Sequence, residues 1–203
     1  MIILEGMDNT GKSSLQDRLC LEYGLGGVHS PGPHESDTVL SWIIEAFNKD
    51  RGVLVVFDRF PLISEAIYGP IIRGHNVFDE SPLGLQLQKK MQEEVKPLII
   101  YCKPPEEYVT KWNDRGQMAG VIENYQKLLQ AYDDLMDKLR PDFSIVPYNY
   151  CHGHDYGKVL EKVDNHIQWW IRERFDKSLV SYKTPGPNRY YDIIKRFGGE
   201  KFL

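Results

Sequence analysis

The chain has 203 residues, of which 41% are hydrophobic and 27% are charged, and its formal net charge is −4. This length suits one globular domain with a sizeable core, and the acidic balance excludes a broad basic surface, so a nucleic-acid partner would need a local basic groove. The three cysteines are far apart and odd in number, which predicts free thiols in a reducing cytoplasm. No apolar run approaches the roughly 18 residues of a membrane span, so we expect no membrane partner.

The first feature along the chain is a strand pattern at residues 1–4, followed at once by a glycine-rich loop. The loop reads Gly6-x-x-x-x-Gly11-Lys12-Ser13, which is the pattern of a phosphate-binding loop (P-loop). Its glycines let backbone N–H groups turn toward phosphate oxygens, Lys12 places a charge at the β- and γ-phosphates, and the Ser13 hydroxyl can ligate Mg²⁺. The pattern predicts an ATP and Mg²⁺ site formed by Gly6, Met7, Asp8, Asn9, Thr10, Gly11, Lys12, Ser13 and Ser14.

Helix and strand patterns alternate along the rest of the chain. A helix begins near Lys12 and ends near Gly24, and a weak second strand at residues 27–29 precedes a helix at 36–50 with a helical apolar period. A continuous apolar run at 53–57 is typical of a strand buried on both faces. The remaining elements are expected as a helix at 81–95, a strand at 98–101, a short helix from 104, a helix at 121–139, a strand at 143–146 and a helix at 155–175.

This alternation predicts an α/β fold, a P-loop NTPase three-layer sandwich with a five-stranded parallel sheet covered on both faces. Ligands of such sheets bind at the carboxyl ends of the strands. The loop at Gly6 follows the first strand, and Asp58-Arg59 follows the third. We therefore expect both motifs to meet at one edge of the sheet.

The first motif resembles that of the thymidylate kinase family. In that family it reads Glu-Gly-x-Asp-x-x-Gly-Lys-[Ser/Thr], which residues 5–13 match in full. The Asp within the loop is uncommon among phosphate-binding loops, and in the family it points to the sugar of the phosphoryl acceptor, a role that the resemblance gives to Asp8. The family's second motif is Asp-Arg-[Tyr/His] followed by Ser and Ala-Tyr, and it corresponds here to Asp58-Arg59-Phe60, with Ser64 and Tyr68 beyond.

The resemblance spans roughly residues 1–170 and implies a P-loop kinase domain over residues 1–176, with a small lid at about 113–120 and a carboxy-terminal arm of uncertain order at 177–203. The roles that it implies for catalysis fall on Lys12, Asp58, Arg59 and Arg115. The residues that it implies for contact with the acceptor are Asp8, Arg59, Phe60 and Tyr68. Mg²⁺ would be held by Ser13 and Asp58.

The segment after the second strand departs from the family. Most members have Arg-Glu-Pro-Gly there, with an arginine that helps to hold the acceptor, whereas this chain has His29-Ser30-Pro31-Gly32. A free monophosphate carries about two negative charges and needs several basic partners, so the loss of an arginine weakens such a site. A hydroxyl group on a base needs a pocket for a flipped or single-stranded pyrimidine instead, with aromatic stacking. The rings available near the expected face are Phe60, Tyr68, Trp112, Tyr125 and Tyr132.

The sequence leads to three candidate functions, of which two are kinases and one is a regulatory ATPase. Residues 63–70 resemble a phage-type branch of the family, which includes kinases for the hydroxymethyl group of 5-hydroxymethyluracil in phage DNA, a step in thymidine hypermodification. We favour that function over a dTMP kinase that makes dTDP, and over a nucleotide-dependent regulatory ATPase without an acceptor. We expect a cytoplasmic protein (in the host cytoplasm if viral), and a homodimer is compatible with the resemblance. The basic residues available to line a DNA groove are Arg172, Arg174, Lys177, Lys183, Arg189, Lys195 and Arg196.

Overall fold

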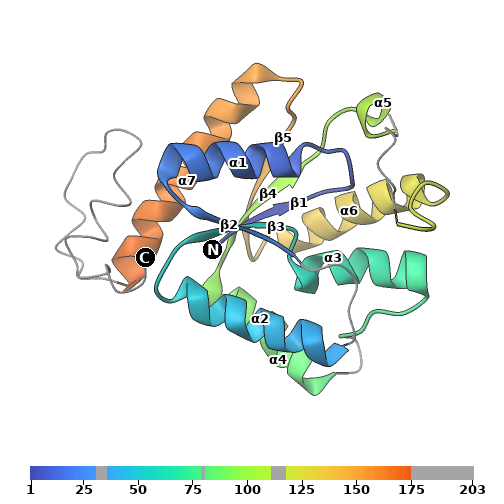
Figure 1. Ribbon diagram of the computed structural model, residues 1–203, viewed down its shortest axis with the longest axis horizontal. Helices are drawn as coiled ribbons and strands as arrows, with labels where there is room; N and C mark the ends of the chain where they lie inside the picture. The colour runs from blue at the N-terminus through green and yellow to red at the C-terminus, as the bar shows by residue number, and fades with distance from the viewer. Residues whose placement is uncertain (31–35, 79–80, 111–117, 175–203) are drawn as a thin grey trace.

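One parallel sheet forms the centre of the molecule, as seen in a computed structural model that describes residues 1–30, 36–78, 81–110 and 118–174 (Figure 1). Its strand order is β2-β3-β1-β4-β5, and all four strand pairings are parallel. The strands are β1 Ile2–Glu5, β2 Gly26–His29, β3 Val55–Asp58, β4 Leu98–Cys102 and β5 Ser144–Tyr148. Every residue of β1, β3 and β4 is buried, because helices cover both faces of the sheet.

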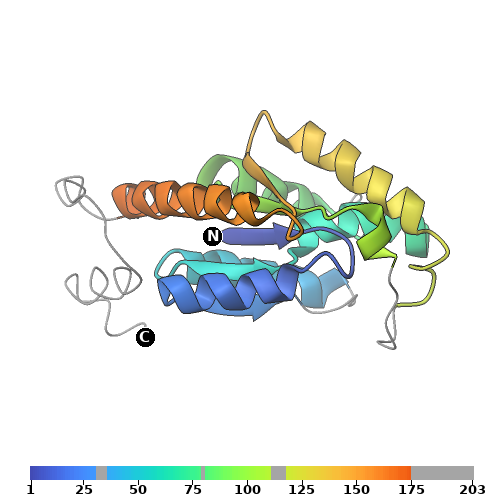
Figure 2. The same cartoon turned by 90° about the horizontal axis from the view of Figure 1, so that it is seen from above.

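Seven α-helices and two short π-helical segments lie within the described residues. They are α1 Lys12–Tyr23, α2 Ser36–Asp50, α3 Pro61–Tyr68, η1 Gly69–Arg73, α4 Pro82–Lys90, η2 Met91–Val95, α5 Glu106–Val109, α6 Tyr125–Leu139 and α7 Gly153–Arg174. The apolar side chains of α1 and α7 form one core with one face of the sheet. Those of α2, α3, α4 and α6 form a second core on the opposite face. Figure 2 shows α1 and α7 extending alongside β1.

The strand register brings the ends of β1, β2 and β3 to one level. Asp58, the last residue of β3, lies opposite Leu4 of β1 and opposite His29 of β2. The glycine-rich loop leaves β1 one residue after this level. The register therefore puts that loop, His29 and Asp58 at the same edge of the sheet, as expected for ligands of a parallel sheet.

The predicted α/β fold with five parallel strands and helices on both faces is confirmed. One region differs: the sequence predicts no helix between residues 57 and 81, where the structure has α3 and η1. Pro61 at the first helical position, Leu62, Ile63 and Ile67 are all buried. Helix α3 has eight residues, fewer than the roughly 11–18 over which a helical period is recognised in a sequence.

Two further helix boundaries also shift. The helix expected from residue 121 begins at Tyr125, because residues 119–124 form turns, with Gly120 in a left-handed conformation (φ 85°). The helix expected at 81–95 ends in the π-helical segment η2. Most of the expected lid (113–120) and the whole arm at 177–203 lie outside the described residues. Within those residues, no helix is both long and apolar enough to cross a membrane.

A stability comparison tests the packing of the α3–η1 segment. A Cβ atom at Gly69 would lie 2.6 Å from the backbone oxygen of His75. Gly69→Ala should therefore lower the free energy of unfolding by about 1–3 kcal/mol, measured by urea denaturation. Gly157→Ala in α7 is the matched control, because a Cβ there meets no atom within 4 Å. That control should leave stability unchanged or raise it by about 0.5–1 kcal/mol. Equal effects of the two changes would contradict the packing.

Candidate active site

The glycine-rich loop depends on two backbone positions that only glycine tolerates. Gly6 has φ 141°, and a Cβ atom there would lie 2.4 Å from the carbonyl oxygen of Cys102. Gly11 has φ 79°, and a Cβ there would lie 2.9 Å from the ring of Tyr150. A left-handed φ and close contact together exclude other side chains. The loop thus has the tight curvature that a phosphate-binding loop needs, and it leads directly into α1 at Lys12.

Lys12 extends across this loop rather than into solvent. The side chain is buried, and its Nζ donates to the carbonyl oxygen of Met7 at 2.5 Å and lies 3.4 Å from Thr10 Oγ1. Burial, followed by the nearby positive charge of Arg59, lowers the pKa of the Lys12 ammonium to about 8. A buried cation that is held by a neutral carbonyl gains stability from any anion placed beside it.

Asp58 connects α1 to the ends of β2 and β3. Its Oδ2 accepts a hydrogen bond from Ser13 Oγ at 2.7 Å and lies 3.3 Å from His29 Nδ1. Its Oδ1 is buried, and no hydrogen-bond partner for it occurs among the described residues. A hydroxyl and a carboxylate with an unsatisfied oxygen fit a hard cation such as Mg²⁺, which takes one or two carboxylates together with phosphate oxygens. Within the described ranges, no group of three or more His, Cys, Asp or Glu side chains is arranged to hold a metal by itself.

Arg59 is held at three points. Its backbone has φ 69°, an uncommon conformation for a residue with a side chain. Its Nη2 donates to Asp8 Oδ1 at 2.7 Å and to the Tyr68 hydroxyl at 3.0 Å, and its Nη1 donates to the Tyr132 hydroxyl at 2.9 Å. The guanidinium also lies over the Tyr68 ring, 4.8 Å from the centroid. These contacts fix the guanidinium next to the phosphate-binding loop, on the side of Asp8.

Glu5, at the end of β1, stabilises the turn that carries Arg59. Its fully buried carboxylate accepts hydrogen bonds from the Phe60 backbone N–H at 2.7 Å, from Ser64 Oγ at 3.0 Å and from the Tyr132 hydroxyl at 3.2 Å. Burial raises the pKa of Glu5, and the charge of Arg59 and the Phe60 N–H oppose this rise. Glu5 thus joins the end of β1 to the turn that carries Arg59.

The structure brings most of the predicted residues together, namely Gly6, Met7, Asp8, Asn9, Thr10, Gly11, Lys12, Ser13, Asp58, Arg59 and Tyr68. Phe60 is the exception, because its ring is fully buried and packs against the rings of Phe57, at 5.5 Å, and Phe47, at 5.7 Å. The ring therefore belongs to the core, and the expected contact of Phe60 with the acceptor is wrong for its side chain. Arg115 and Trp112 lie outside the described residues.

Sequence reasoning missed two residues of the site. Glu5 belongs to the first motif, but its role depends on donors from distant parts of the chain. Tyr150, in the loop after β5, is 40% exposed, lies against Gly11 and meets Tyr108 edge to face at 6.0 Å. No local pattern marks Tyr150, since only the sheet order brings β5 near the phosphate-binding loop.

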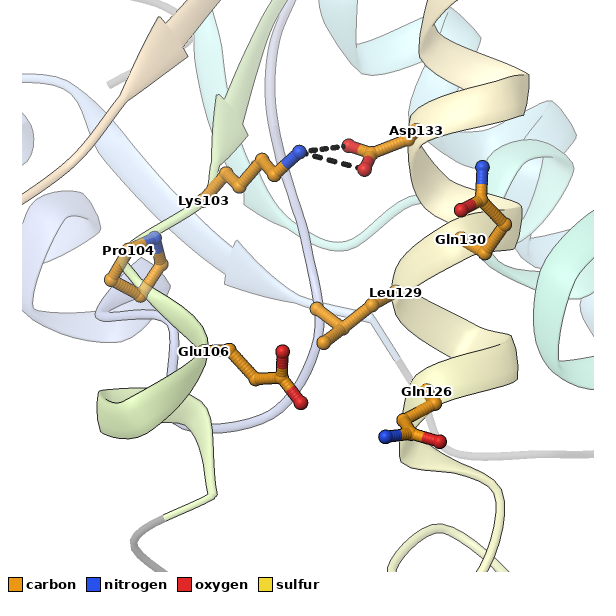
Figure 3. Close-up of a pocket in the computed structure, with 7 residues that line it drawn as sticks. All are labelled: Lys103, Pro104, Glu106, Gln126, Leu129, Gln130 and Asp133. Atoms are coloured by element: carbon orange, nitrogen blue, oxygen red, sulfur yellow. Dashed lines mark hydrogen bonds and ion pairs between the residues drawn. The ribbon is translucent and has the colours of Figure 1, made fainter.

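A separate cavity of about 270 Å³ lies between the start of α5 and α6 (Figure 3). Its lining consists of Lys103, Pro104, Glu106, Gln126, Leu129, Gln130 and Asp133. Lys103 Nζ lies 2.6 Å from both carboxylate oxygens of Asp133, so this ion pair closes one end of the cavity. None of the predicted site residues lines it.

Comparison with known proteins supports the fold. No family model and no curated protein matches the chain. Among solved structures, the YorR protein of Bacillus subtilis in complex with phosphorylated GDP is similar with a TM-score of 0.60 and 17% identity, over 86% of this chain and 98% of that one. Thymidylate kinase from Candida albicans has a TM-score of 0.54 and 14% identity, over 82% and 91% of the two chains. Deoxyadenosine kinase from M. mycoides with bound dATP has a TM-score of 0.52 and 14% identity, over 80% and 98%.

The chain shares its α/β fold with these proteins. At these low identities the similarity concerns the fold alone.

The buried carboxylate of Glu5 gives the test of this site's architecture. Glu5→Ala removes the acceptor of three donors, two of them buried, and the negative charge near Arg59, so the free energy of unfolding should fall by about 3–5 kcal/mol in urea denaturation. Glu5→Gln keeps an oxygen for the Phe60 N–H and should lose about 1–3 kcal/mol. If Glu5→Ala proved as stable as the unchanged protein, the assigned hydrogen bonds would be wrong.

Proposed function

We propose that this chain is an ATP-dependent phosphotransferase. The observation that carries the proposal is that Lys12, Asp58 and Arg59 converge beside a glycine-rich loop of the curvature described above. Phosphoryl transfer needs alignment and charge neutralisation more than covalent participation by the protein. In this proposal the loop N–H groups and Lys12 hold the β- and γ-phosphates of ATP, and the N-terminus of α1 adds its positive dipole end.

Mg²⁺ would be held by Ser13 and Asp58, whose buried Oδ1 offers a further oxygen. When bound, the ion neutralises charge on the phosphate oxygens. Arg59 would stabilise the oxygens of the phosphoryl group as they gain charge during transfer. An acceptor hydroxyl then attacks the γ-phosphorus, the bond to the β–γ bridging oxygen breaks, ADP leaves, and the hydroxyl proton passes to Asp58 or to water.

The acceptor that we favour is the hydroxymethyl group of 5-hydroxymethyluracil in phage DNA. The charge around Arg59 supports a neutral hydroxyl as acceptor, because Arg59 is paired with the Asp8 carboxylate and its remaining N–H donors serve the transferring phosphoryl group in this proposal. Arg73, the next arginine along the chain, is paired with the Glu65 carboxylate. The strand β2 ends in His29 rather than arginine. An acceptor phosphate with about two negative charges would therefore find little uncommitted positive charge among the described residues.

The alternative is a dTMP kinase that makes dTDP, and the similarity in fold to Candida albicans thymidylate kinase favours it. The acidic composition, with a net charge of −4, also argues against a DNA acceptor. Arg174, one of the basic residues considered for a DNA groove, forms an ion pair with Asp50 at 2.6 Å. A regulatory ATPase without an acceptor is the third possibility. It gives no reason for Asp8 and Arg59 to be paired beside the phosphate-binding loop.

An acceptor panel with γ-labelled ATP separates these functions. The panel contains dTMP, hydroxymethyl-dUMP, thymine DNA and hydroxymethyluracil DNA. We expect label on hydroxymethyluracil DNA, and binding to that DNA should weaken steeply with added salt because phosphate contacts release counterions. Label on free nucleotides alone would favour the alternative, and label released only as phosphate would favour the regulatory ATPase.

Lys12→Ala should abolish transfer with the fold intact, and an unchanged rate at saturating ATP would refute the phosphate-loop assignment.

The lowered pKa of Lys12 predicts the pH dependence of ATP binding. Bound phosphates favour the ammonium form, whereas the free protein loses this proton above a pKa of about 8. Binding should therefore take up a proton above pH 8, and affinity should fall there by at most roughly tenfold per pH unit, with no contribution from Lys12 well below pH 8.

Calorimetry at pH 9 in two buffers with different ionisation enthalpies measures this proton uptake. Lys12→Ala is the control, and its weaker binding should show no such uptake. An affinity that stays constant between pH 7.5 and pH 9.5 would contradict the buried position of the Lys12 ammonium.

A further inference from the structure

Two stacked tyrosines lie between the candidate active site and the cavity of Figure 3. The rings of Tyr101, on β4, and Tyr132, on α6, have centroids 6.0 Å apart and are nearly parallel, at 18°. Both side chains are buried. Their hydroxyls have different partners: Tyr132 reaches Arg59 and Glu5, whereas Tyr101 donates to Asp133 Oδ1 at 2.9 Å. Asp133 belongs to the ion pair with Lys103 that Figure 3 shows.

The Tyr132 hydroxyl has a fixed direction. A phenol carries one proton, and this one goes to Glu5 Oε2 at 3.2 Å, so the phenol oxygen faces Arg59 as an acceptor for Nη1 at 2.9 Å. Burial raises the pKa of Tyr132 well above its usual range, which keeps this group a neutral phenol. Glu5 therefore determines the side on which Tyr132 offers its lone pair.

The contact with Tyr132 holds a part of the Arg59 guanidinium that the other hydrogen bonds do not reach. Asp8 and Tyr68 both bind the same nitrogen of Arg59, Nη2, and the Asp8 side chain is 32% exposed. Both contacts hold the same end of the guanidinium, and one of them is to a carboxylate that solvent reaches. Tyr132 holds the other end, at Nη1, from a fully buried position.

We propose that Tyr132 is a positioning residue that fixes the plane of the Arg59 guanidinium for phosphoryl transfer. The proposal rests on the phosphotransferase function inferred above. Donors that are already oriented toward developing charge lower the barrier, because they need no reorganisation during the reaction. Loss of this orientation acts on the transfer step and leaves nucleotide binding by the phosphate-binding loop unchanged.

Tyr101 provides a matched control for this role. Tyr101→Phe and Tyr132→Phe each delete one phenolic hydroxyl from the same stacked pair, and each leaves a carboxylate without one donor. Only Tyr132→Phe touches Arg59. A purely structural role would make the two variants lose melting temperature and activity in parallel.

Steady-state kinetics and melting temperatures of both variants form the first test. In Tyr132→Phe we expect kcat to fall about ten- to a hundredfold, with the KM values for ATP and acceptor within about twofold of the unchanged protein. In Tyr101→Phe we expect kcat to stay within about twofold, at a similar loss of melting temperature. A fall in kcat that is equal in both variants, or a change confined to KM, would overturn the proposal.

A second test needs no catalysis. The ¹⁵N side-chain NMR signals of Arg59, assigned with Arg59→Lys, report hindered rotation of the guanidinium in the ligand-free protein. We expect separate Nη signals in the unchanged protein and in Tyr101→Phe, and averaged signals in Tyr132→Phe. Signals that stay separate in Tyr132→Phe would overturn the proposal. If the unchanged protein transferred label to no acceptor, the proposed function would fail, and the NMR comparison alone would decide the role of Tyr132.

Discussion

The Glu5 carboxylate is the interaction on which the rest of the candidate active site depends. It is completely buried at the end of the central strand β1, and it gathers donors from the turn after β3, from α3 and from α6. A buried carboxylate is costly unless it is compensated, so the fold must supply those donors and the nearby Arg59 charge. The compensation has a functional consequence, since the turn that satisfies Glu5 is the turn that carries Arg59.

Charge compensation also defines the two halves of the site. On the donor side, Lys12 is a buried cation whose nearest partners are neutral oxygens of its own loop, so an anion would find an unmatched positive charge there. On the acceptor side, Arg59 is matched by Asp8 and two phenols, and Asp58 faces Ser13 and His29. This distribution of charge is the basis on which we propose polyphosphate for the donor half and a neutral hydroxyl group for the acceptor half.

Much of this architecture is visible in the sequence, because local spacing encodes it. The loop from Gly6 to Ser13 and the buried runs of β1, β3 and β4 each have a pattern that is specific over a few residues, and they predicted the fold and the meeting of the two motifs. Properties that depend on distant partners had no such pattern. Phe60 looked like an acceptor contact from its place after Arg59, yet its ring fills the core. Helix α3 was not predicted because its eight residues are too few to show a helical period. The roles of Glu5, Tyr132 and Tyr150 arise only once the sheet order brings their elements together.

A crystal structure with Mg²⁺ and a non-hydrolysable ATP analogue would show whether the loop from Gly6 to Ser13 holds a triphosphate with its outermost phosphorus beside Arg59. We expect Lys12 Nζ to leave the Met7 carbonyl for a phosphate oxygen, the metal to lie at Ser13 and Asp58, and the guanidinium of Arg59 to face the terminal phosphate. A nucleotide bound with its phosphates elsewhere, or with Lys12 still bonded to Met7, would contradict it.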